Sequence, residues 1–241
     1  MLGWVGKPVT QFFPDLIRLH PEIATVTVVI YRPAPVLADR LIGGVDPGLA
    51  IRTRAEVLNR EHGIGFWDAV LAIGMREGQL PEQYVELALL HDSAAGEREL
   101  NLSRDEVSTG GLSRLIGSLD LDYGLSVSSR VQLDDGRQAH IPMMDFRCQH
   151  SDANLEIIKR ALVAMGQSHG ALVQSSRSYH FYGLGLLAER AWLRFLGMSI
   201  LFSPIADVRY IGHRLADGAC RLRLSAAANR GDAPRVVAVF Q

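Results

Sequence analysis

The sequence predicts an α+β fold built on an antiparallel or mixed sheet with helices on one of its faces. From residue 123 onward, the expected order is two strands, a helix, two strands, a helix and three strands. The strands alternate apolar and polar residues, whereas the helices space their apolar residues along one face. An Asp-Gly turn between the first two strands is typical of a β-hairpin, in which neighbouring strands run antiparallel.

The amino-terminal part predicts several helices and one strand. A helix is expected at residues 10–19, and the run Thr-Val-Thr-Val-Val-Ile-Tyr predicts a strand at residues 24–31. Prolines and glycines between residues 33 and 48 predict loops. Further helices are expected at residues 54–62, 67–76 and 80–90, the last with Pro81 in its first turn.

The polar stretch at residues 91–111 has few apolar residues in register and therefore predicts a connector. We place a domain boundary near residue 110. It separates an N-terminal α/β part, residues 1–110, from a core, residues 111–241, on which the first part is expected to pack.

The core is expected to begin with the hairpin. Strands at residues 124–133 and 138–146 flank the turn Asp134-Asp135-Gly136. Ser151 then predicts the N-cap of a helix that ends near Gly166. The remaining expected elements are strands at residues 171–174 and 179–184, a helix at 187–197, and strands at 207–215, 219–225 and 236–240.

The composition excludes several classes of protein. The 241 residues are 48% hydrophobic and 21% charged, close to the average for soluble globular proteins. No apolar run approaches the roughly 20 residues that cross a bilayer, so we expect a cytoplasmic protein without a membrane partner. Cys148 and Cys220 lack zinc-ligand spacing. Glycine-rich loops of the Rossmann or P-loop type are absent from the sequence.

Charge is distributed unevenly along the chain. Residues 177–241 hold nine arginines and four acids, a net charge of +5, whereas the first 176 residues carry −6. Lys7 and Lys159 are the only lysines, a preference that biased codon usage also explains. Because a guanidinium fork suits phosphate oxygens, the basic segment indicates a phosphate-bearing partner.

A first motif, residues 141–147 (Ile-Pro-Met-Met-Asp-Phe-Arg), places an aspartate at the end of an apolar strand. A buried lone carboxylate is unfavourable unless a cation or hydrogen bonds compensate it. We therefore expect Asp145 to lie in a cleft or to hold a metal ion. A helix cap or a salt bridge with Arg147 is the structural alternative.

A second motif, residues 175–183 (Ser-Ser-Arg-Ser-Tyr-His-Phe-Tyr-Gly), carries polar side chains at alternate positions. Along a strand, Ser178, His180 and Tyr182 point to one face. Arg177 points the other way unless the turn rotates it. A hydroxyl, an imidazole and a guanidinium suit phosphate oxygens. The alternative is a polar strand face with a satisfied histidine.

A third motif lies at residues 203–215. Asp207 is expected to begin a strand in which Arg209 and Ile211 share a face, before a break that precedes His213 and Arg214. Asp145 and Asp207 are 62 positions apart (207 − 145), so they meet only if the sheet places their strands side by side. We predict that both carboxylates converge beside His180 to form a cation and triphosphate pocket.

Taken in this order, the three motifs resemble the signature motifs of archaeo-eukaryotic primases and primase-polymerases. The single aspartate of the first motif resembles the 1D-like variants of that superfamily. The resemblance covers roughly residues 123–239. It implies an RRM-like sheet and a nucleotidyltransferase that binds a nucleoside triphosphate with a divalent metal and acts on a nucleic-acid template.

By this resemblance, Asp145, His180 and Asp207 are the catalytic residues, and the two aspartates hold Mg²⁺ or Mn²⁺, which prefer carboxylate and phosphate oxygens. The resemblance also implies a group that contacts phosphate or template. Its candidate members are Arg177, Ser178, His180, Arg209, His213 and Arg214.

One position departs from the family. The first motif usually supplies two acids, and here the second position is Arg147, which reverses the charge. Two interpretations stay open: a primase-polymerase with an atypical first motif, or a catalytically weakened module that binds nucleotide or nucleic acid in a replication, mobile-element or defence assembly. A helicase or another protein of such an assembly is a candidate partner. A third interpretation is an interaction scaffold assembled through Trp67, Trp192 and apolar helices.

Overall fold

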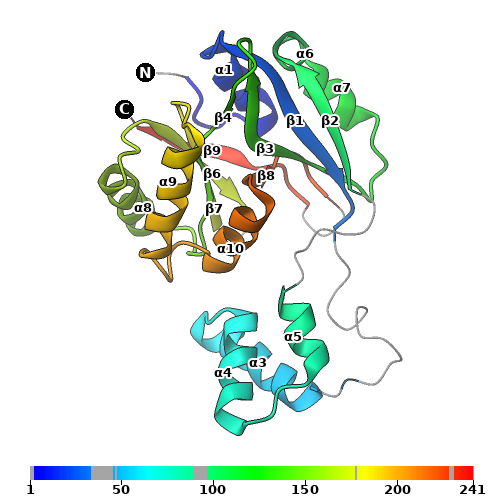
Figure 1. Cartoon of the computed structure of the whole chain (residues 1–241), viewed down its shortest axis with the longest axis vertical. Coiled ribbons are helices and arrows are strands. Elements are labelled where there is room, and N and C mark those ends of the chain that lie inside the picture. The colour runs from blue at the N-terminus through cyan, green and yellow to red at the C-terminus, as the bar shows by residue number, and fades with distance from the viewer. Residues whose placement is uncertain are drawn as a thin grey trace. The chain divides into compact units, whose positions relative to one another are not determined.

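The computed structural model describes residues 3–33, 46, 48–89, 97–176, 178–227 and 231–240. The chain forms two compact units (Figure 1). The main unit comprises Met1–Pro33 and Ala94–Gln241, and the inserted unit comprises Ala34–Ser93. The main unit contains two antiparallel sheets.

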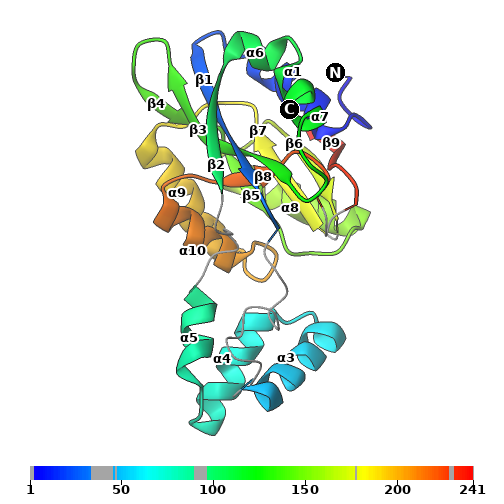
Figure 2. The ribbon, with the colours of Figure 1, turned by 90° about the vertical axis from the view of Figure 1, so that its right-hand side faces the viewer.

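The first sheet has five strands. It contains strands from both of the predicted parts, residues 1–110 and residues 111–241. Its path is β2-β1-β3-β4, and β8 also pairs with β3 (Figure 2). All of these pairs are antiparallel. The strands are β1 (Ile23–Tyr31), β2 (Arg98–Ser103), β3 (Gly124–Leu133), β4 (Gln138–His140) and β8 (Arg221–Arg223).

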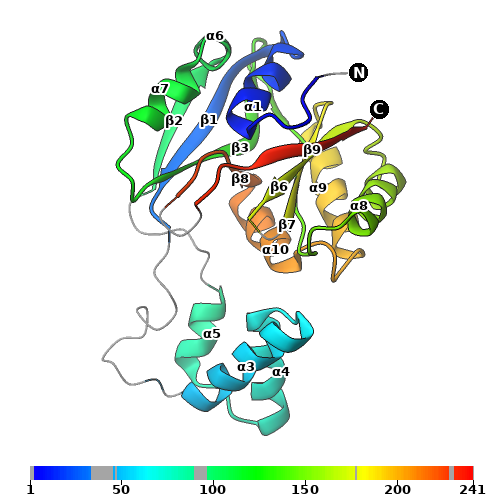
Figure 3. The same ribbon diagram turned by 180° about the vertical axis from the view of Figure 1, so that it is seen from behind.

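The second sheet has four strands in the order β5-β7-β6-β9. They are β5 (Met143–Asp145), β6 (Gly170–Ser175), β7 (Ser178–Gly183) and β9 (Arg235–Phe240). Because β7 is antiparallel to both β5 and β6, these two strands run parallel and are linked through α8. This is the split βαβ arrangement of RRM-like sheets. Figure 3 shows β9 beside β6, close to the segment before α1, where the Gly6 amide donates to the Val236 carbonyl at 2.8 Å.

The α+β class is confirmed, because the main unit combines its two antiparallel sheets with helices. These helices are α1 (Val9–Arg18), α6 (Arg104–Ser108), α7 (Gly111–Gly117), α8 (Asp152–Ala164), α9 (Glu189–Ile200) and α10 (Val208–Asp217). The predicted N-cap of α8 is also present, since the Ser151 hydroxyl accepts the Asn154 amide at 3.1 Å.

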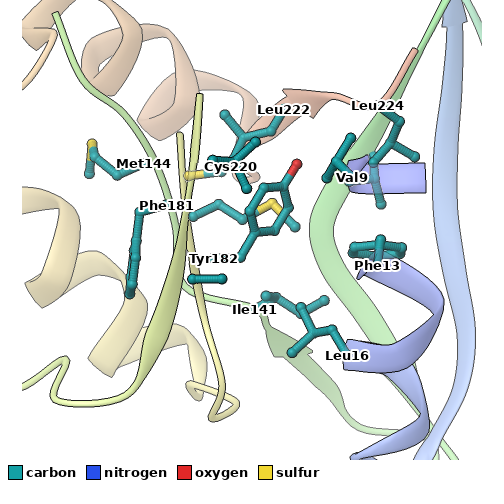
Figure 4. Packing of buried hydrophobic residues seen from close by; sticks show 14 of the residues in the cluster. Val9, Phe13, Leu16, Ile141, Met144, Phe181, Tyr182, Cys220, Leu222 and Leu224 are labelled. Carbon is teal, nitrogen blue, oxygen red and sulfur yellow. The ribbon is translucent and has the colours of Figure 1, made fainter. Parts of the chain in front are cut away.

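The core of the main unit lies on both sides of β7. Figure 4 shows Phe181 and Tyr182 pointing to opposite sides of this strand. Tyr182 meets Phe12 and Phe13 of α1 edge-on, with ring centroids 5.6 and 6.2 Å apart. Phe181 lies 6.3 Å from Phe195 of α9. One face of the second sheet therefore packs on α1, and the other is covered by helices.

The strand expected at residues 138–146 is split between the two sheets, which corrects that prediction. β4 stays with β3, whereas β5 pairs with β7. The change falls at Ile141 and Pro142, where the Ile141 amide still donates to Ser129 while the Pro142 carbonyl accepts the Gly183 amide, each at 2.8 Å. Proline has no amide to continue the first ladder, so the chain crosses to the second sheet here.

The connector expected at residues 91–111 is also corrected. It contains β2 and α6, with Ser103 and Glu106 forming a capping box at the start of that helix. β2 is partly exposed and its pattern is weak, but pairing with β1 supplies its backbone hydrogen bonds. The compact units accordingly differ from the division expected near residue 110.

The described residues of the inserted unit form three helices, which the sequence predicts. They are α3 (Leu49–His62), α4 (Phe66–Glu77) and α5 (Glu82–Leu89). The first two end at Gly63 and Gly78, which adopt left-handed backbone. A small core forms from Ile51, Ala55, Ala69, Val70, Ile73, Tyr84 and Leu87.

No helix in the described ranges combines the length and the apolar character that crossing a membrane requires.

A polar cluster around the buried His140 joins β3, β4 and α9. The His140 ring lies 4.3 Å from the Trp192 ring in a stacked arrangement. Its Nδ1 is 3.1 Å from the Ser129 hydroxyl, and its Nε2 is 2.8 Å from a Glu189 carboxylate oxygen. Burial lowers the pKa of His140 below its ordinary value, although Glu189 opposes that change.

We expect the inserted unit to be dispensable for folding of the main unit. Ile30 and Arg98 are paired across β1 and β2, so the chain leaves and re-enters the main unit at neighbouring points. Replacing residues 34–93 with a short glycine-serine linker should preserve cooperative unfolding, with a melting temperature within a few degrees of the full chain, as measured by circular dichroism. Loss of the cooperative transition would contradict this expectation.

We also expect His140 to make stability depend on pH. Because its folded pKa is lowered, the unfolded state binds the extra proton first, so stability is lost as pH falls through the ordinary value of 6.5. Urea unfolding at pH 7.5 and 5.5 should show a smaller pH effect in His140→Gln than in the wild type. His62→Gln, which changes an exposed histidine of α3, is the matched control and should leave the pH effect unchanged.

Candidate functional site

Asp145 and His180 lie directly opposite each other in neighbouring strands. They are Cα partners in the antiparallel pair β5–β7, so their side chains share a face of the second sheet. His180 Nε2 is 3.7 Å from Asp145 Oδ1. The histidine is buried, whereas the aspartate side chain is 34% exposed. The carboxylate therefore remains accessible to a ligand while the imidazole is held beneath the surface.

Asp207 reaches the same place from the other edge of β5. The Asp207 amide donates to the Asp145 carbonyl at 3.4 Å, and the Arg147 amide donates to the Ile205 carbonyl at 2.7 Å. Phe146 and Ala206 form a β-bridge between these contacts. The backbone thus brings Asp145, His180 and Asp207 together, although they come from three separate segments of the chain.

The strand expected at residues 207–215 is a helix, which corrects that prediction as well. Asp207 is the N-cap of α10, and its Oδ1 accepts the amides of Arg209 at 3.0 Å and Tyr210 at 3.1 Å. The helix buries Ile211 and Arg214, three residues apart, as helical periodicity requires. Gly218 is the C-cap of this helix and has a left-handed backbone conformation. The chain then leads to β8.

The second motif forms the β6–β7 hairpin. Ser175 and Ser178 are partners at its tip, and the Ser178 hydroxyl donates to the Phe146 carbonyl of the first motif. The Phe146 amide in turn donates to the Tyr179 carbonyl at 2.9 Å. The first two motifs are therefore joined by hydrogen bonds. Arg177, the predicted phosphate contact at the tip, lies outside the described residues.

The other three predicted phosphate contacts all belong to α10. Arg209 and His213 are half-buried and four residues apart, so they share a helix face. Arg214 differs from them. Its side chain is 1% exposed, forms an ion pair with Asp217 at 2.9 Å and lies 5.5 Å from the Tyr210 ring centroid. The buried position of Arg214 within the helix packing separates it from Arg209 and His213.

Arg147 replaces the second acid of the first motif. Burial alternates along residues 144–147, with Met144 and Phe146 buried and both Asp145 and Arg147 half-buried. Since the ladder continues through Phe146 and Arg147 on the Ile205 side, strand geometry places Arg147 on the face of Asp145. A positive charge thus shares the face on which an ion would bind.

The donor set fits a hard divalent ion only in part. In the parts of the chain that the structure describes, no group of three or more histidine, cysteine, aspartate and glutamate side chains is placed to hold a metal ion. Asp145 and Asp207 supply two carboxylates. Mg²⁺ commonly binds through one or two carboxylates and completes its shell with substrate phosphates and water. The two aspartates are therefore compatible with an ion that arrives together with a polyphosphate.

Arg223 is a residue near this site to which the sequence assigned no role. It comes from β8 of the first sheet and is 8% exposed. Its guanidinium Nη2 donates to the hydroxyls of Ser176 at 3.0 Å and Ser175 at 3.3 Å. The alternation Arg-Leu-Arg in β8 is its only sequence signal, and any partly exposed strand shows the same pattern.

The pKa of the Tyr182 phenol is affected by both Arg223 and Asp145. Burial raises the pKa of Tyr182 far above its ordinary value, the Arg223 guanidinium opposes that rise, and the Asp145 carboxylate adds to it. Burial also raises the pKa of the Cys148 thiol, to which Asp145 contributes. The charges of Arg223 and Asp145 therefore both act on the buried Tyr182 phenol.

A comparison with protein families agrees with the three motifs. The family model described as archaeo-eukaryotic primase 1D-like matches residues 103–234, which is more than half of the chain. The matched segment contains Asp145, His180 and Asp207. No curated protein and no solved structure matches the chain.

Two substitutions of Asp207 should separate its capping role from its charge. Asparagine caps helices about as well as aspartate, whereas alanine costs about 1 kcal/mol. Urea unfolding should therefore show Asp207→Asn close to the wild type and Asp207→Ala less stable by about that amount. Equal destabilisation by both substitutions would contradict the capping geometry.

Proposed function

Since this chain belongs to the archaeo-eukaryotic primase 1D-like family, we propose that it is a nucleotidyltransferase of the primase-polymerase type. It binds a nucleoside triphosphate together with Mg²⁺ or Mn²⁺ and extends a nucleic acid on a template. The family match supports the primase-polymerase-like fold. To this fold we add three proposals: the nucleotidyl-transfer reaction, the divalent metal and the nucleic-acid template.

The proposal rests on one observation, the convergence of Asp145, His180 and Asp207 around β5. The two carboxylates would hold the divalent ion, which neutralises the triphosphate and activates the attacking hydroxyl when bound. His180 lies 3.7 Å from Asp145, within reach of a phosphate bound to the same ion. Its burial fixes the ring, so this donor is oriented before the substrate arrives.

Further contacts to the substrate would come from two groups of residues. Ser178 sits at the start of β7, and its hydroxyl already donates to the Phe146 carbonyl, so this hydroxyl would have to exchange that bond for one to a phosphate. Arg209 and His213 share a face of α10 beside the capping aspartate. We assign them to the triphosphate or the template. Arg214 is assigned to the helix packing.

Binding without catalysis is the second candidate function, and Arg147 favours it. A guanidinium on the face of Asp145 opposes a second cation there, because like charges repel strongly at short range. One ion would then have to serve both the attacking and the leaving oxygen. A module that retains triphosphate binding but transfers nucleotides slowly or not at all fits this charge pattern.

The test is nucleotide incorporation on primed and unprimed single-stranded templates, with Mg²⁺, with Mn²⁺ and with chelator. We expect incorporation that requires the ion and falls by about 100-fold or more in Asp145→Asn and Asp207→Asn, the scale for losing one electrostatic stabiliser of a transition state. Asp207→Asn is informative because it retains the helix cap. Asp152→Asn removes the same charge from an exposed position in the first turn of α8 and should keep full activity.

Calorimetric titration of a nucleoside triphosphate with Mn²⁺ distinguishes the two candidates. Binding that weakens in Asp145→Asn, without any incorporation by the wild type, would establish the binding module. Incorporation that persists in chelator or in both aspartate variants would overturn the nucleotidyltransferase. If the wild type neither binds nor incorporates, both candidates fall.

A further inference from the structure

The turn between β6 and β7 has an unusual backbone conformation. Ser175 and Ser178 are paired, so residues 176 and 177 alone connect the two strands. Ser176 has a φ of 50° and is the only non-glycine residue with positive φ in the described ranges. Two-residue hairpin loops favour such a conformation, but it is unfavourable for a residue with a Cβ atom. An additional interaction is therefore needed to hold Ser176.

Arg223 supplies that interaction from the other sheet. Its Nη2 donates to the Ser176 hydroxyl at 3.0 Å and to the Ser175 hydroxyl at 3.3 Å. Its Nη1 donates to the carbonyls of Ser225 at 2.7 Å and Asp232 at 2.6 Å. The Nη1 atom of the guanidinium thus binds backbone carbonyls, and the Nη2 atom binds the two serine hydroxyls of the turn. A planar fork can do both at once, which an ammonium group cannot.

The far side of the same hairpin is held by residues that follow β5. His150 Nε2 donates to the Ser178 carbonyl at 2.8 Å. The Ser151 amide donates to the Tyr179 hydroxyl at 2.9 Å. Together with the bond from Ser178 to Phe146, these contacts tie the amino end of β7 to the strand that carries Asp145. A change in the turn would therefore be transmitted toward the site.

We propose that Arg223 is a positioning residue that holds Ser176 in its left-handed conformation and so fixes the start of β7 for a polyphosphate ligand. The nature of that ligand rests on the proposed function. Fixing the turn in advance removes the ordering cost that binding would otherwise incur. Arg223 acts through Ser176 and the backbone, so its role does not require contact with the phosphates.

The binding test uses inorganic tripolyphosphate with Mn²⁺ as the probe, measured by calorimetry on the full chain. Arg223→Met should weaken binding by about tenfold, the scale set by the cost of ordering a left-handed non-glycine residue when the ligand binds. Arg221→Met is the matched control. Arg221 lies two residues earlier on β8 and pairs with Glu97 and Glu99 at 2.6 and 2.7 Å, so its loss should leave binding unchanged. Equal effects of the two substitutions would overturn the proposal.

Substitutions of Ser176 distinguish positioning from direct contact. Glycine and alanine both remove the hydroxyl, but only glycine adopts positive φ without penalty. We expect Ser176→Gly to bind tripolyphosphate more tightly than Ser176→Ala, and Arg223→Met combined with Ser176→Gly to recover most of the affinity lost in Arg223→Met. A double variant as weak as Arg223→Met would mean that Arg223 contacts the phosphates itself, and the positioning role would be rejected. The Ser176 pair also keeps the test valid if Arg223→Met does not fold.

Hydrogen exchange separates this inference from the proposed function. In the unliganded protein, amides of residues 174–180 should exchange faster in Arg223→Met than in Arg221→Met, whether or not any triphosphate binds. Unchanged exchange would overturn the positioning role. Failure of the wild type to bind the probe, with faster exchange in Arg223→Met, would instead reject the polyphosphate ligand and with it the proposed function.

Discussion

The arrangement of the site depends on the backbone pairing of β5 along both of its edges. This strand has only three residues, yet β7 pairs with one edge and residues 205–207 with the other. Asp145 is placed opposite His180 by register and next to Asp207 by the continuing ladder. Because backbone hydrogen bonds set these positions, the side chains converge without needing to bond to one another. Substituting one of them should leave the other two in place.

The position of β5 depends in turn on the crossing at Ile141 and Pro142. Up to Ile141 the chain belongs to the first sheet, and from Pro142 it is bonded to Gly183 of the second. Arg223 adds a contact in the opposite direction, from β8 of the first sheet to the β6–β7 turn of the second. The two sheets are thus linked on both sides of the candidate site, which limits how far they can separate there.

The sequence predicted that Asp145, His180 and Asp207 come together, but it did not predict the helix that begins after Asp207. Alternation in the second motif gave the correct face for His180, and the Asp-Gly turn gave the β3–β4 hairpin. In the third motif, alternation of Arg209 and Ile211 suggested a strand. The spacing of Val208, Ile211 and Leu215, by three and then four residues, fits a helix just as well. Short amphipathic segments fit both periods, and the deciding fact, the hydrogen bonds from the Arg209 and Tyr210 amides to Asp207, is visible only in three dimensions.

Two other features were out of reach for a similar reason. β2 has an exposed pattern and is a strand because β1 offers it a register. Arg223 looks like any surface arginine of an alternating strand, and its burial follows from Ser175 and Ser176, which are nearly fifty positions away. Pairings of this range follow from the topology and leave no local signal. The strand crossing at Pro142 was signalled by the proline itself, but its destination was not.

The helix cap also explains how Asp207 could serve an ion without being disordered in its absence. Its Oδ1 accepts the amides of Arg209 and Tyr210 at the start of α10. The orientation of the side chain is therefore set by the helix. The Asp145 backbone is paired on both sides, so an ion would have to order only its side chain. With only two such ligands, however, the affinity for an isolated ion would be modest, because the phosphates of a substrate must supply the remaining oxygens. Metal and triphosphate should accordingly bind as a coupled pair, each raising the affinity for the other by the same factor.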